Sequence, residues 1–307
     1  MKPGKIFLFI LPILILITIS TSGKTIYPQG AQKALKNVTQ PFINYTLMVE
    51  VHKLSSEINN GKSCEYPLYI SEMNNGLIYC AEIKNGDNVT SDREFYFSKY
   101  DTTIKAWIKP INIKKDFAKF CEENKTMNFT EIFVTIDNDI YRVDLSNKEF
   151  TTDKLNINTK GIEASPILSP DGNTLYFVSD RKGGFGGKDI WASERLSNGN
   201  WSEPYNLGKD VNTSEDEESP YIMLDGVTLY FSSKGHNSFG GYDIFMTTQD
   251  YDGLWSKSEN LGAPVNSTSD DYYYITDSFG KKAYYSSDKV EKGNQDIYFV
   301  QYNSFGK

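Results

Sequence analysis

The sequence predicts an all-β protein assembled from repeated sheets, and two observations support this fold class. The 307 residues include 21 Tyr, 18 Phe and 4 Trp beside 23 Gly. Aromatic residues favour strands and glycine favours tight turns, so this combination is typical of β structure. In addition, the carboxyl-terminal half of the chain repeats itself with an offset of 54 residues, which indicates a repeat architecture.

Composition excludes several other classes of protein. At 39% hydrophobic residues the chain has enough apolar material for a packed core, which bulk disorder lacks. Its three cysteines are too few for a disulfide scaffold. Cys64 and Cys80 could pair and leave Cys121 odd, or all three could be free thiols. The formal net charge of -8 argues against a partner bound through its phosphates, so we expect no nucleic-acid partner.

The first 23 residues read as an export signal. Lys2 and Lys5 precede an apolar stretch at 6–17, and small residues lead to an expected cleavage position after Gly23. A retained anchor is the alternative, but 6–19 is only 14 residues long and a spanning helix needs about 20. We therefore expect no transmembrane span in the mature chain, which would carry 30 basic and 40 acidic side chains once both lysines are removed. Residues 24–41 are a lead-in to the fold.

Short motifs recur throughout the carboxyl-terminal half. The matched segments are Ser165-Pro166 and Ser219-Pro220, Asp171-Gly172 and Asp225-Gly226, Leu175-Tyr176-Phe177 and Leu229-Tyr230-Phe231, Phe185-Gly186-Gly187 and Phe239-Gly240-Gly241, and Val211-Asn212 and Val265-Asn266. A triplet of one acidic, one apolar and one aromatic residue extends the pattern in both directions, starting at 94, 139, 189, 243 and 296. These triplets define five repeats.

Each complete repeat contains four short stretches of strand-forming residues. In the copy at 218–261 the expected strands are 221–224, 227–232, 243–247 and 255–261, with turns at Asp225-Gly226 and at 250–253. Four strands per unit of this length are typical of a β-propeller blade. A solenoid is the rival architecture, but its repeats are usually shorter.

The two ends of the repeat region predict how the ring closes. The last copy stops after 296–302 and lacks a fourth strand, whereas 42–54 precedes the first copy and is rich in strand formers. We therefore predict a single propeller over 42–303, in which the amino-terminal segment completes the last blade and removes exposed sheet edges. The five predicted blades are 64–113, 117–155, 163–207, 217–261, and 270–302 together with 42–54.

The repeat motifs also carry a family resemblance. The segment 169–180 (Ser-Pro-Asp-Gly-Asn-Thr-Leu-Tyr-Phe-Val-Ser-Asp), the Phe-Gly-Gly-x-Asp-Ile-aromatic segments and 201–208 (Trp-Ser-Glu-Pro-Tyr-Asn-Leu-Gly) resemble the WD-like, PD40-type β-propeller repeats of TolB-type proteins. Exported proteins of Bacteroidota-type bacteria often carry such repeats before an OmpA-like domain, which we do not expect in these 307 residues. The resemblance covers 163–302 closely and 64–157 more loosely.

What the resemblance implies is a location and a role. It implies an exported protein in the periplasm or at the outer membrane, or a secreted protein outside such bacteria. It also implies binding to an envelope protein or to a peptidoglycan-associated complex.

Catalysis finds little support in the sequence. The chain has two histidines, His52 and His236, the latter expected on the surface, and it lacks a Gly-x-Ser-x-Gly elbow and zinc-binding spacings. A glycosidase with two carboxylates stays open because 40 acidic residues are present. We therefore favour a non-catalytic protein-interaction scaffold. The alternative is a glycan-binding protein or a carbohydrate-active hydrolase that uses the central channel.

The candidate binding face follows from the predicted fold. In a propeller, the connections from the second to the third strand and from one blade to the next open on one face, and loops on a rigid scaffold often carry binding residues. The candidate residues in these loops are Arg181, Lys182, Phe185, Lys188, Glu215, Asp216, Glu217, Glu218, His236, Phe239, Asp270 and Asp271. Phe185 and Phe239 could instead fill space between blades, and the acidic runs could be solvated loops.

The remaining repeated residues are interpreted as structural. The triplet aspartates Asp139, Asp189, Asp243 and Asp296 are expected to accept backbone hydrogen bonds and to fix the preceding loop. Trp107, Trp201 and Trp255 are expected to pack between blades. We expect no cofactor, with Ca²⁺ at the acidic run 215–218 as the alternative.

Overall fold

The computed structural model describes residues 47–71, 75–85, 88–113, 131–144 and 151–304. The predicted export signal (1–23), the lead-in (24–41) and residues 117–130 of the predicted second blade lie outside this part. All regular elements in the described residues are β-strands, so the all-β prediction is confirmed. No helix within these ranges is long and apolar enough to cross a membrane.

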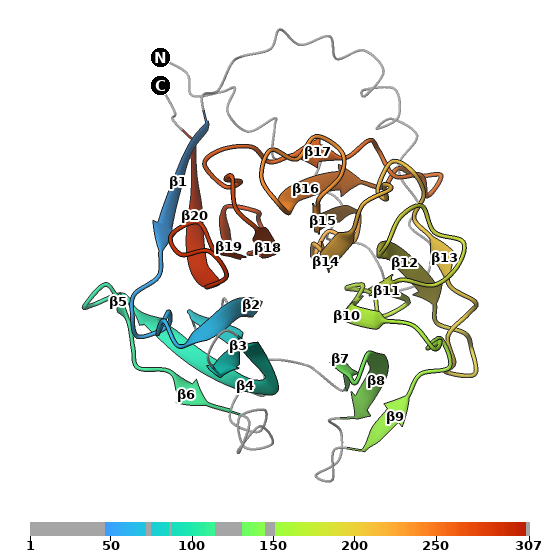
Figure 1. Cartoon of the computed structure of the whole chain (residues 1–307), viewed down its shortest axis with the longest axis horizontal. Coiled ribbons are helices and arrows are strands. Elements are labelled where there is room, and N and C mark those ends of the chain that lie inside the picture. Colours follow the sequence, from blue (N-terminus) through green and yellow to red (C-terminus); the bar gives the residue numbers. More distant parts are fainter. Residues whose placement is uncertain (1–46, 72–74, 86–87, 114–130, 145–150, 305–307) are drawn as a thin grey trace, which may run out of the picture. The chain divides into compact units, whose positions relative to one another are not determined.

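Five antiparallel sheets follow one another along the unit Thr46–Lys307 and form the blades of a propeller, as predicted (Figure 1). The third blade contains β10 (Glu163–Leu168), β11 (Thr174–Ser179), β12 (Asp189–Glu194) and β13 (Tyr205–Asn206). The fourth blade contains β14 (Glu217–Ile222), β15 (Thr228–Ser233), β16 (Asp243–Thr248) and β17 (Glu259–Asn260). In both blades the strands pair in sequence order.

The first two blades depart from this regular pattern. The first contains β2 (Ser63–Ser71), β3 (Gly76–Asn85), β4 (Asn88–Asp101), β5 (Ala106–Trp107) and β6 (Ile111–Asn112). Its last two strands both pair with β4. The described part of the second blade contains β7 (Glu131–Ile136), β8 (Asp139–Asp144) and β9 (Thr152–Lys154).

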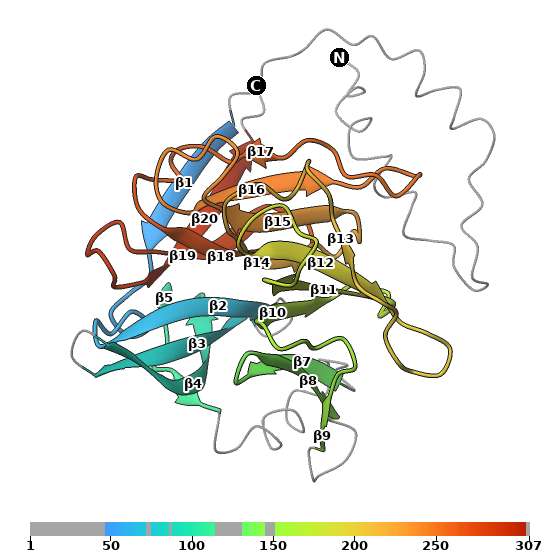
Figure 2. The same ribbon diagram turned by 45° about the vertical axis from the view of Figure 1, so that its right-hand side comes forward.

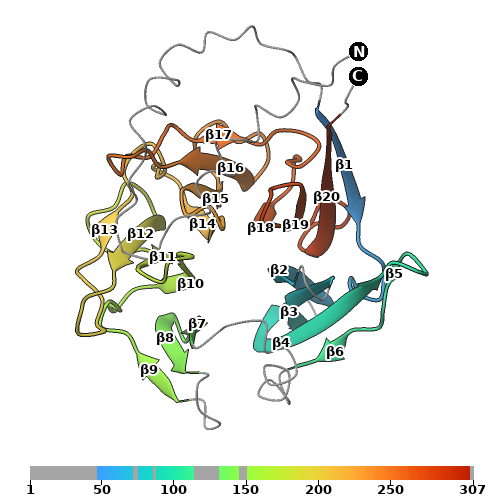
Figure 3. The ribbon, with the colours of Figure 1, turned by 180° about the vertical axis from the view of Figure 1, so that it is seen from behind.

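The fifth blade joins the two ends of the propeller. It contains β18 (Asp271–Thr276), β19 (Lys282–Ser287), β20 (Asp296–Ser304) and β1 (Leu47–Lys53). Strand β1 pairs antiparallel with β20 along its whole length, from Leu47 opposite Ser304 to Lys53 opposite Tyr298, and the two strands lie side by side in Figure 3. This confirms that an amino-terminal strand completes the last blade. Figure 2 shows the fourth blade beside the fifth.

Strands β2, β10, β14 and β18 lie on the inner side of the ring of sheets (Figure 1). All four shift register in their pairing with the next strand, and three of them, β10, β14 and β18, do so near the start. The third residue of each has a left-handed φ, at 49° for Ser165, 52° for Ser219 and 54° for Tyr273. The Ser-Pro motif of the third and fourth blades and Tyr273-Tyr274 of the fifth therefore mark β-bulges, which redirect the inner strands.

The apolar core is divided into clusters that lie between neighbouring blades. One cluster joins Ile190 of the third blade to Leu229 and Phe245 of the fourth, all fully or almost fully buried. The tryptophans lie at these junctions. Trp201 packs edge-on against Phe133, Trp255 against Tyr176, and Trp107 against Tyr284, with ring centroids 5.6, 6.1 and 6.0 Å apart. Each tryptophan thus contacts an adjacent blade.

An asparagine side chain replaces part of a strand in several blades. The Ile190 N–H donates to Asn212 Oδ1 at 2.8 Å, and Asn212 Nδ2 donates to the Ile190 carbonyl at 2.9 Å. The same pair of bonds joins Asn266 to Ile244 and Asn158 to Ile140. The fourth strand of these blades is short and leaves some backbone groups of the third strand without a strand partner. The asparagine amide forms hydrogen bonds with these groups instead.

Candidate binding site

The two sets of loops that the sequence placed on one face are in direct contact. The Lys188 N–H donates to Asp216 Oδ1 at 3.1 Å, and the Tyr242 N–H donates to Asp270 Oδ1 at 2.9 Å. Each bond joins the connection between the second and third strands of one blade to the loop that enters the next. A Cβ on Gly186 would overlap the backbone oxygen of Glu215, so glycine is required here for close approach.

Aspartates at the start of the third strands hold these loops in place. Asp189 accepts the N–H groups of Phe185 and Gly186 at 2.5 and 3.1 Å. Asp243 accepts the Phe239 N–H at 3.0 Å. The other two triplet aspartates differ, because Asp139 and Asp296 accept lysine ammonium groups instead, from Lys154 at 2.6 Å and from Lys53 at 2.5 Å.

The candidate residues divide into exposed and buried groups. Phe185 and Phe239 are 52% and 49% exposed, so they do not fill space between blades, and Lys182 and Glu215 are also exposed. The structure corrects the expected position of two others. Glu217 and Asp271 are fully buried, because each starts an inner strand and turns its carboxylate into the loop that precedes it.

The buried carboxylates have a repeated hydrogen-bonding environment. Glu217 accepts the Thr213 N–H at 2.9 Å and the Ser233 hydroxyl at 2.7 Å. Burial raises the pKa of Glu217 to about 7 and that of Asp271 to about 6, although hydrogen bonds to each act in the opposite direction. These two acids therefore stabilise loops from within and do not form part of an exposed surface.

Arg181 and His236 are also less exposed than the sequence suggested. The Arg181 guanidinium lies over Phe177 and Trp191, 4.9 and 5.3 Å from the ring centroids, and pairs with buried Glu163 at 3.3 Å. The His236 ring packs 5.1 Å from the centroid of Phe245. Both are part of the internal packing of their blades, so neither serves as a freely exposed contact.

A pocket of about 570 Å³ is lined by His236, Asn237, Lys257, Ser258, Glu259 and Asn260. The Nε2 atom of His236 lies 2.9 Å from the Val211 carbonyl oxygen. Since a carbonyl only accepts, Nε2 carries the proton in this contact. This hydrogen bond holds the imidazole ring at the junction between the third and fourth blades.

One ion pair at the loop face joins the third blade to the fourth, and a second lies within the fourth blade. Lys188 Nζ lies 2.5 Å from Glu218 Oε1, and Lys234 Nζ lies 3.2 Å from Asp216 Oδ2. Although burial alone would lower it, the neighbouring Glu218 carboxylate raises the pKa of Lys188. Lys234 Nζ also lies 4.5 Å from the ring centroid of Tyr242, which makes a cation–π contact.

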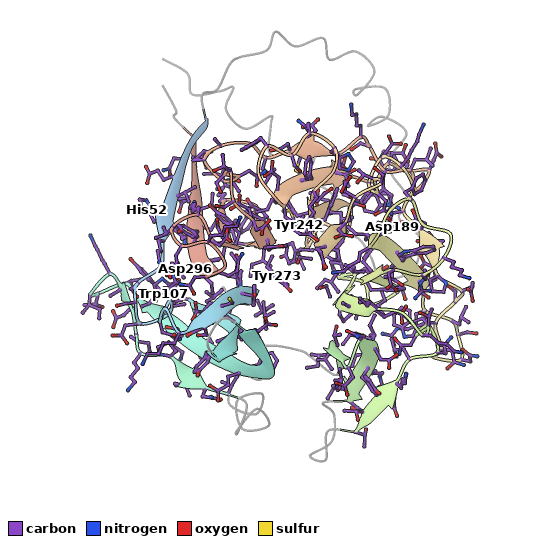
Figure 4. All side chains as sticks on the ribbon, viewed as in Figure 1. His52, Trp107, Asp189, Tyr242, Tyr273 and Asp296 are labelled. Carbon is purple, nitrogen blue, oxygen red and sulfur yellow. The ribbon has the colours of Figure 1, made fainter. Side chains whose placement is uncertain are left out.

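The most distinctive feature of this face is a row of four tyrosines, which we call the tyrosine row: Tyr242, Tyr272, Tyr273 and Tyr66. Their successive ring centroids lie 4.6, 6.2 and 4.7 Å apart, so the row runs from the fourth blade through the fifth to the first. All except Tyr242 are partly exposed. In Figure 4, Tyr242 and Tyr273 lie on the inner side of the ring of sheets.

The sequence carries a signal for the tyrosine row, which is a departure from the 54-residue repeat. Where the fourth blade has Glu218, Ser219 and Pro220, the fifth has Tyr272, Tyr273 and Tyr274. A departure from a repeat marks a position that the fold does not require. The matches between repeats therefore indicate the fold, whereas this mismatch indicates a candidate site.

The positions of acidic side chains and thiols in the described residues bear on the Ca²⁺ and disulfide alternatives. Within them, no group of three or more His, Cys, Asp and Glu side chains is arranged to hold a metal ion. Cys64 and Cys80 are separate buried thiols, and Cys121 lies outside the described ranges. The predicted Ca²⁺ alternative at 215–218 includes Glu217, whose carboxylate is already engaged by Thr213 and Ser233.

No known family and no curated protein matches this sequence. Solved structures match over most of the chain at low identity. A TolB-like protein of Agrobacterium tumefaciens is 13% identical and matches over 85% of this chain and 100% of its own, with a TM-score of 0.37. An α-L-arabinofuranosidase of Lactobacillus brevis is 12% identical over 81% of this chain and 94% of its own, with a TM-score of 0.40.

A puromycin-hydrolysing peptidase of Mycobacterium tuberculosis is 11% identical over 87% of this chain, with a TM-score of 0.39. This chain spans 42% of that peptidase's length. A shared fold does not determine a function, so function is argued from the residues of the site.

Proposed function

We propose that this protein is an exported, non-catalytic β-propeller that binds a protein partner of the cell envelope through its loop face. The observation that carries the proposal is the tyrosine row, whose three partly exposed rings lie beside charged side chains at the inner ends of the blades. Tyrosine is enriched at protein interfaces because its ring buries a large apolar area while its hydroxyl forms hydrogen bonds. The expected location rests on the amino-terminal segment and the TolB-type repeats.

The loops around the tyrosine row also support the proposed protein-binding role. Phe185 and Phe239 are held at the surface by Asp189 and Asp243, which bind the backbone of their loops. Fixed loops lose little conformational freedom on binding, so more of the contact energy contributes to affinity. Exposed aromatic side chains on pre-organised loops are the expected form of a docking surface.

Site-specific photo-crosslinking tests this proposal. A benzoyl-phenylalanine placed at Phe239 on the loop face should capture a discrete envelope protein, and one at Phe185 should capture the same protein. The control position is Tyr251, which is 83% exposed in the turn between β16 and β17. Equal adducts from Tyr251, or no adduct at either phenylalanine, would contradict the proposal.

The second candidate is glycan binding at the same face. Partly exposed tyrosine rings beside carboxylates such as Asp270 suit a sugar, whose C–H groups pack on the ring and whose hydroxyls donate to the acid. Calorimetric titration with a panel of soluble oligosaccharides tests this function. Binding that is lost in Tyr272→Ala would favour it, and hydrolysis of any member would support the hydrolase form of the alternative.

A further inference from the structure

Strand β1 gives the fifth blade a longer outer edge than the third and fourth blades have. β1 covers seven residues, Leu47–Lys53, whereas the outer strands β13 and β17 have two residues each. Strand β20 pairs with one side of β1, and within the described ranges no strand pairs with its other side. In Figure 1, β1 lies at the outer margin of the ring of sheets. An edge of this length is a template for pairing with another strand.

The hydrogen bonds of the fifth blade identify the backbone groups that face outward. The Leu54 N–H donates to the Ile297 carbonyl at 2.9 Å, and β1 continues the same antiparallel register along β20 without a shift. Hydrogen-bonded and non-hydrogen-bonded pairs alternate in such a ladder. The N–H and carbonyl groups of Val49, Val51 and Lys53 therefore point away from β20, at the outer edge.

The side chains of β1 also alternate between two faces. Glu50 and His52 are 47% and 64% exposed, and their Oε2 and Nε2 atoms lie 3.5 Å apart. Val49 and Val51 point to the other face and pack against the core of the fifth blade. The strand has no proline and no bulge, two features that commonly prevent edge pairing. Its charged side chains either repel a partner strand or match it, depending on the register.

A second copy of β1 fits this edge in one register. In antiparallel pairing about a two-fold axis, the outward backbone groups of the two strands have to meet. With Val51 opposite the partner's Val51, Val49 lies opposite the partner's Lys53, and Glu50 lies opposite the partner's His52. This register allows about six backbone hydrogen bonds. It also places each carboxylate opposite an imidazole, which donates an N–H and is a cation when protonated.

The neighbouring registers lose this match. A shift in one direction places Glu50 opposite the partner's Glu50, and a shift in the other places His52 opposite the partner's His52. Like charges directly opposite each other destabilise a pair of strands. Charge complementarity therefore favours the register that is centred on Val51.

We propose that β1 is a self-association edge, through which two copies of this chain join their fifth blades into one continuous antiparallel sheet. The register is the one with Val51 opposite the partner's Val51. The inference goes beyond the proposed function and uses none of the residues of the loop face. Because a single paired edge is a small interface, we expect a dissociation constant of about 10–100 µM.

Sedimentation equilibrium of the chain that starts at residue 24 tests self-association. The average molar mass should rise from that of a monomer towards that of a dimer between about 1 and 300 µM. A monomer mass throughout this range would overturn the proposal, because the charges of β1 would then only protect the edge.

Charge reversal tests the register. Glu50→Lys places two cations opposite each other, and His52→Glu places two carboxylates opposite each other, so each variant alone should dimerise about fivefold more weakly or worse. An equimolar mixture of the two variants should recover dimers, since opposite charges then face each other at both pairs. Glu259→Lys on the exposed side of β17 is the matched control and should dimerise normally. A mixture as weak as the separate variants would overturn the proposal.

Disulfide trapping provides a second measurement, in a Cys121→Ser background in which Cys64 and Cys80 are buried. A mixture of Glu50→Cys and His52→Cys chains should form a mixed disulfide, because directly opposite Cβ atoms are about 4.5–5.5 Å apart. Either variant alone should crosslink more slowly, since its thiols lie diagonally at about 7–8 Å. Crosslinking of either variant alone at the rate of the mixture would overturn the register.

Discussion

The side chain of Asn59 forms two hydrogen bonds with the backbone of Ile297, a residue 238 positions away in the sequence. Ile297 N–H donates to Asn59 Oδ1 at 2.7 Å, and Asn59 Nδ2 donates to the Ile297 carbonyl at 2.9 Å. The same amide also donates to the Leu54 carbonyl. Asn59 therefore extends the closure of the fifth blade beyond the end of β1 and ties both ends of the propeller together.

Replacing Asn59 by aspartate should destabilise the whole domain. The substitution keeps the acceptor but removes the donor, and it places a carboxylate oxygen against two buried carbonyl groups. Lost hydrogen bonds to buried groups cost about 1–3 kcal/mol each, so we expect the free energy of unfolding to fall by at least about 2 kcal/mol. Urea denaturation checks this, with Asn200→Asp at an exposed turn as the control. Equal losses in both variants would contradict the closure role.

Deleting β1 should have a larger effect than removing residues before it. A chain that starts at residue 55 exposes the edge of β20 and loses the packing of Val49 and Val51 against the fifth blade. Open sheet edges promote aggregation, so this protein should aggregate or unfold without cooperativity. A chain that starts at residue 42 retains β1 and should unfold cooperatively. Circular dichroism and light scattering distinguish them, and cooperative unfolding of the shorter chain would show that β1 is dispensable.

Stability should decrease as the pH rises from 5 to 7. In the folded state burial raises the pKa of Glu217 from 4.5 to about 7 and that of Asp271 from 3.8 to about 6. Over this range the folded state therefore holds protons that the unfolded state has released. The stabilisation is fully present below the unfolded pKa and is lost as the pH rises through the folded pKa, by up to about 1.4 kcal/mol per pH unit and group.

Urea denaturation at four pH values between 5 and 8 measures this slope. Glu217→Gln keeps the shape of the side chain and removes its titration, so its slope should be smaller than that of the unmodified protein. A free energy of unfolding that rises with pH across this window would show that the two acids are ionised in the folded state.

Gly186→Ala should cost more than an alanine at an open glycine. At Gly186 the added methyl group overlaps the backbone oxygens of Glu215 and Thr213, and backbone atoms cannot rotate away. Gly199 has a φ of 84° and no neighbour within 4 Å, so Gly199→Ala should cost only the strain of a left-handed residue, about 1–2 kcal/mol. Thermal midpoints provide the comparison. Equal costs would mean that the loop face adapts to the methyl group.

Much of the fold followed from the sequence because repeats record shared packing. The triplets at Asp189 and Asp243, the glycine pairs and the tryptophans recur because equivalent contacts form at successive junctions between blades. The closure by 42–54 was predictable for a related reason, because the last copy lacks a strand that the amino-terminal segment supplies. Each of these features depends on neighbours at a fixed distance in the sequence.

The candidate site was harder to predict. Because Glu217, Asp271 and Arg181 lie in or next to loops, the sequence predicted that all three are on the exposed face. In the structure the two carboxylates are buried, whereas Arg181 packs against aromatic rings and forms an internal ion pair. A carboxylate at the start of a strand can turn outward to solvent or inward to its own loop. Local sequence does not distinguish these two directions, since the hydrogen-bond donors come from residues several positions away.

The sequence by itself determined that this chain is a five-bladed propeller closed by its amino-terminal strand, because periodic packing leaves a periodic pattern. Only the tertiary structure brings the tyrosines of the row together. Tyr66 and Tyr273 are 207 positions apart, yet their ring centroids are 4.7 Å apart because the fifth blade meets the first when the ring closes. Contacts of that kind arise from closure, and no local pattern in the chain encodes them.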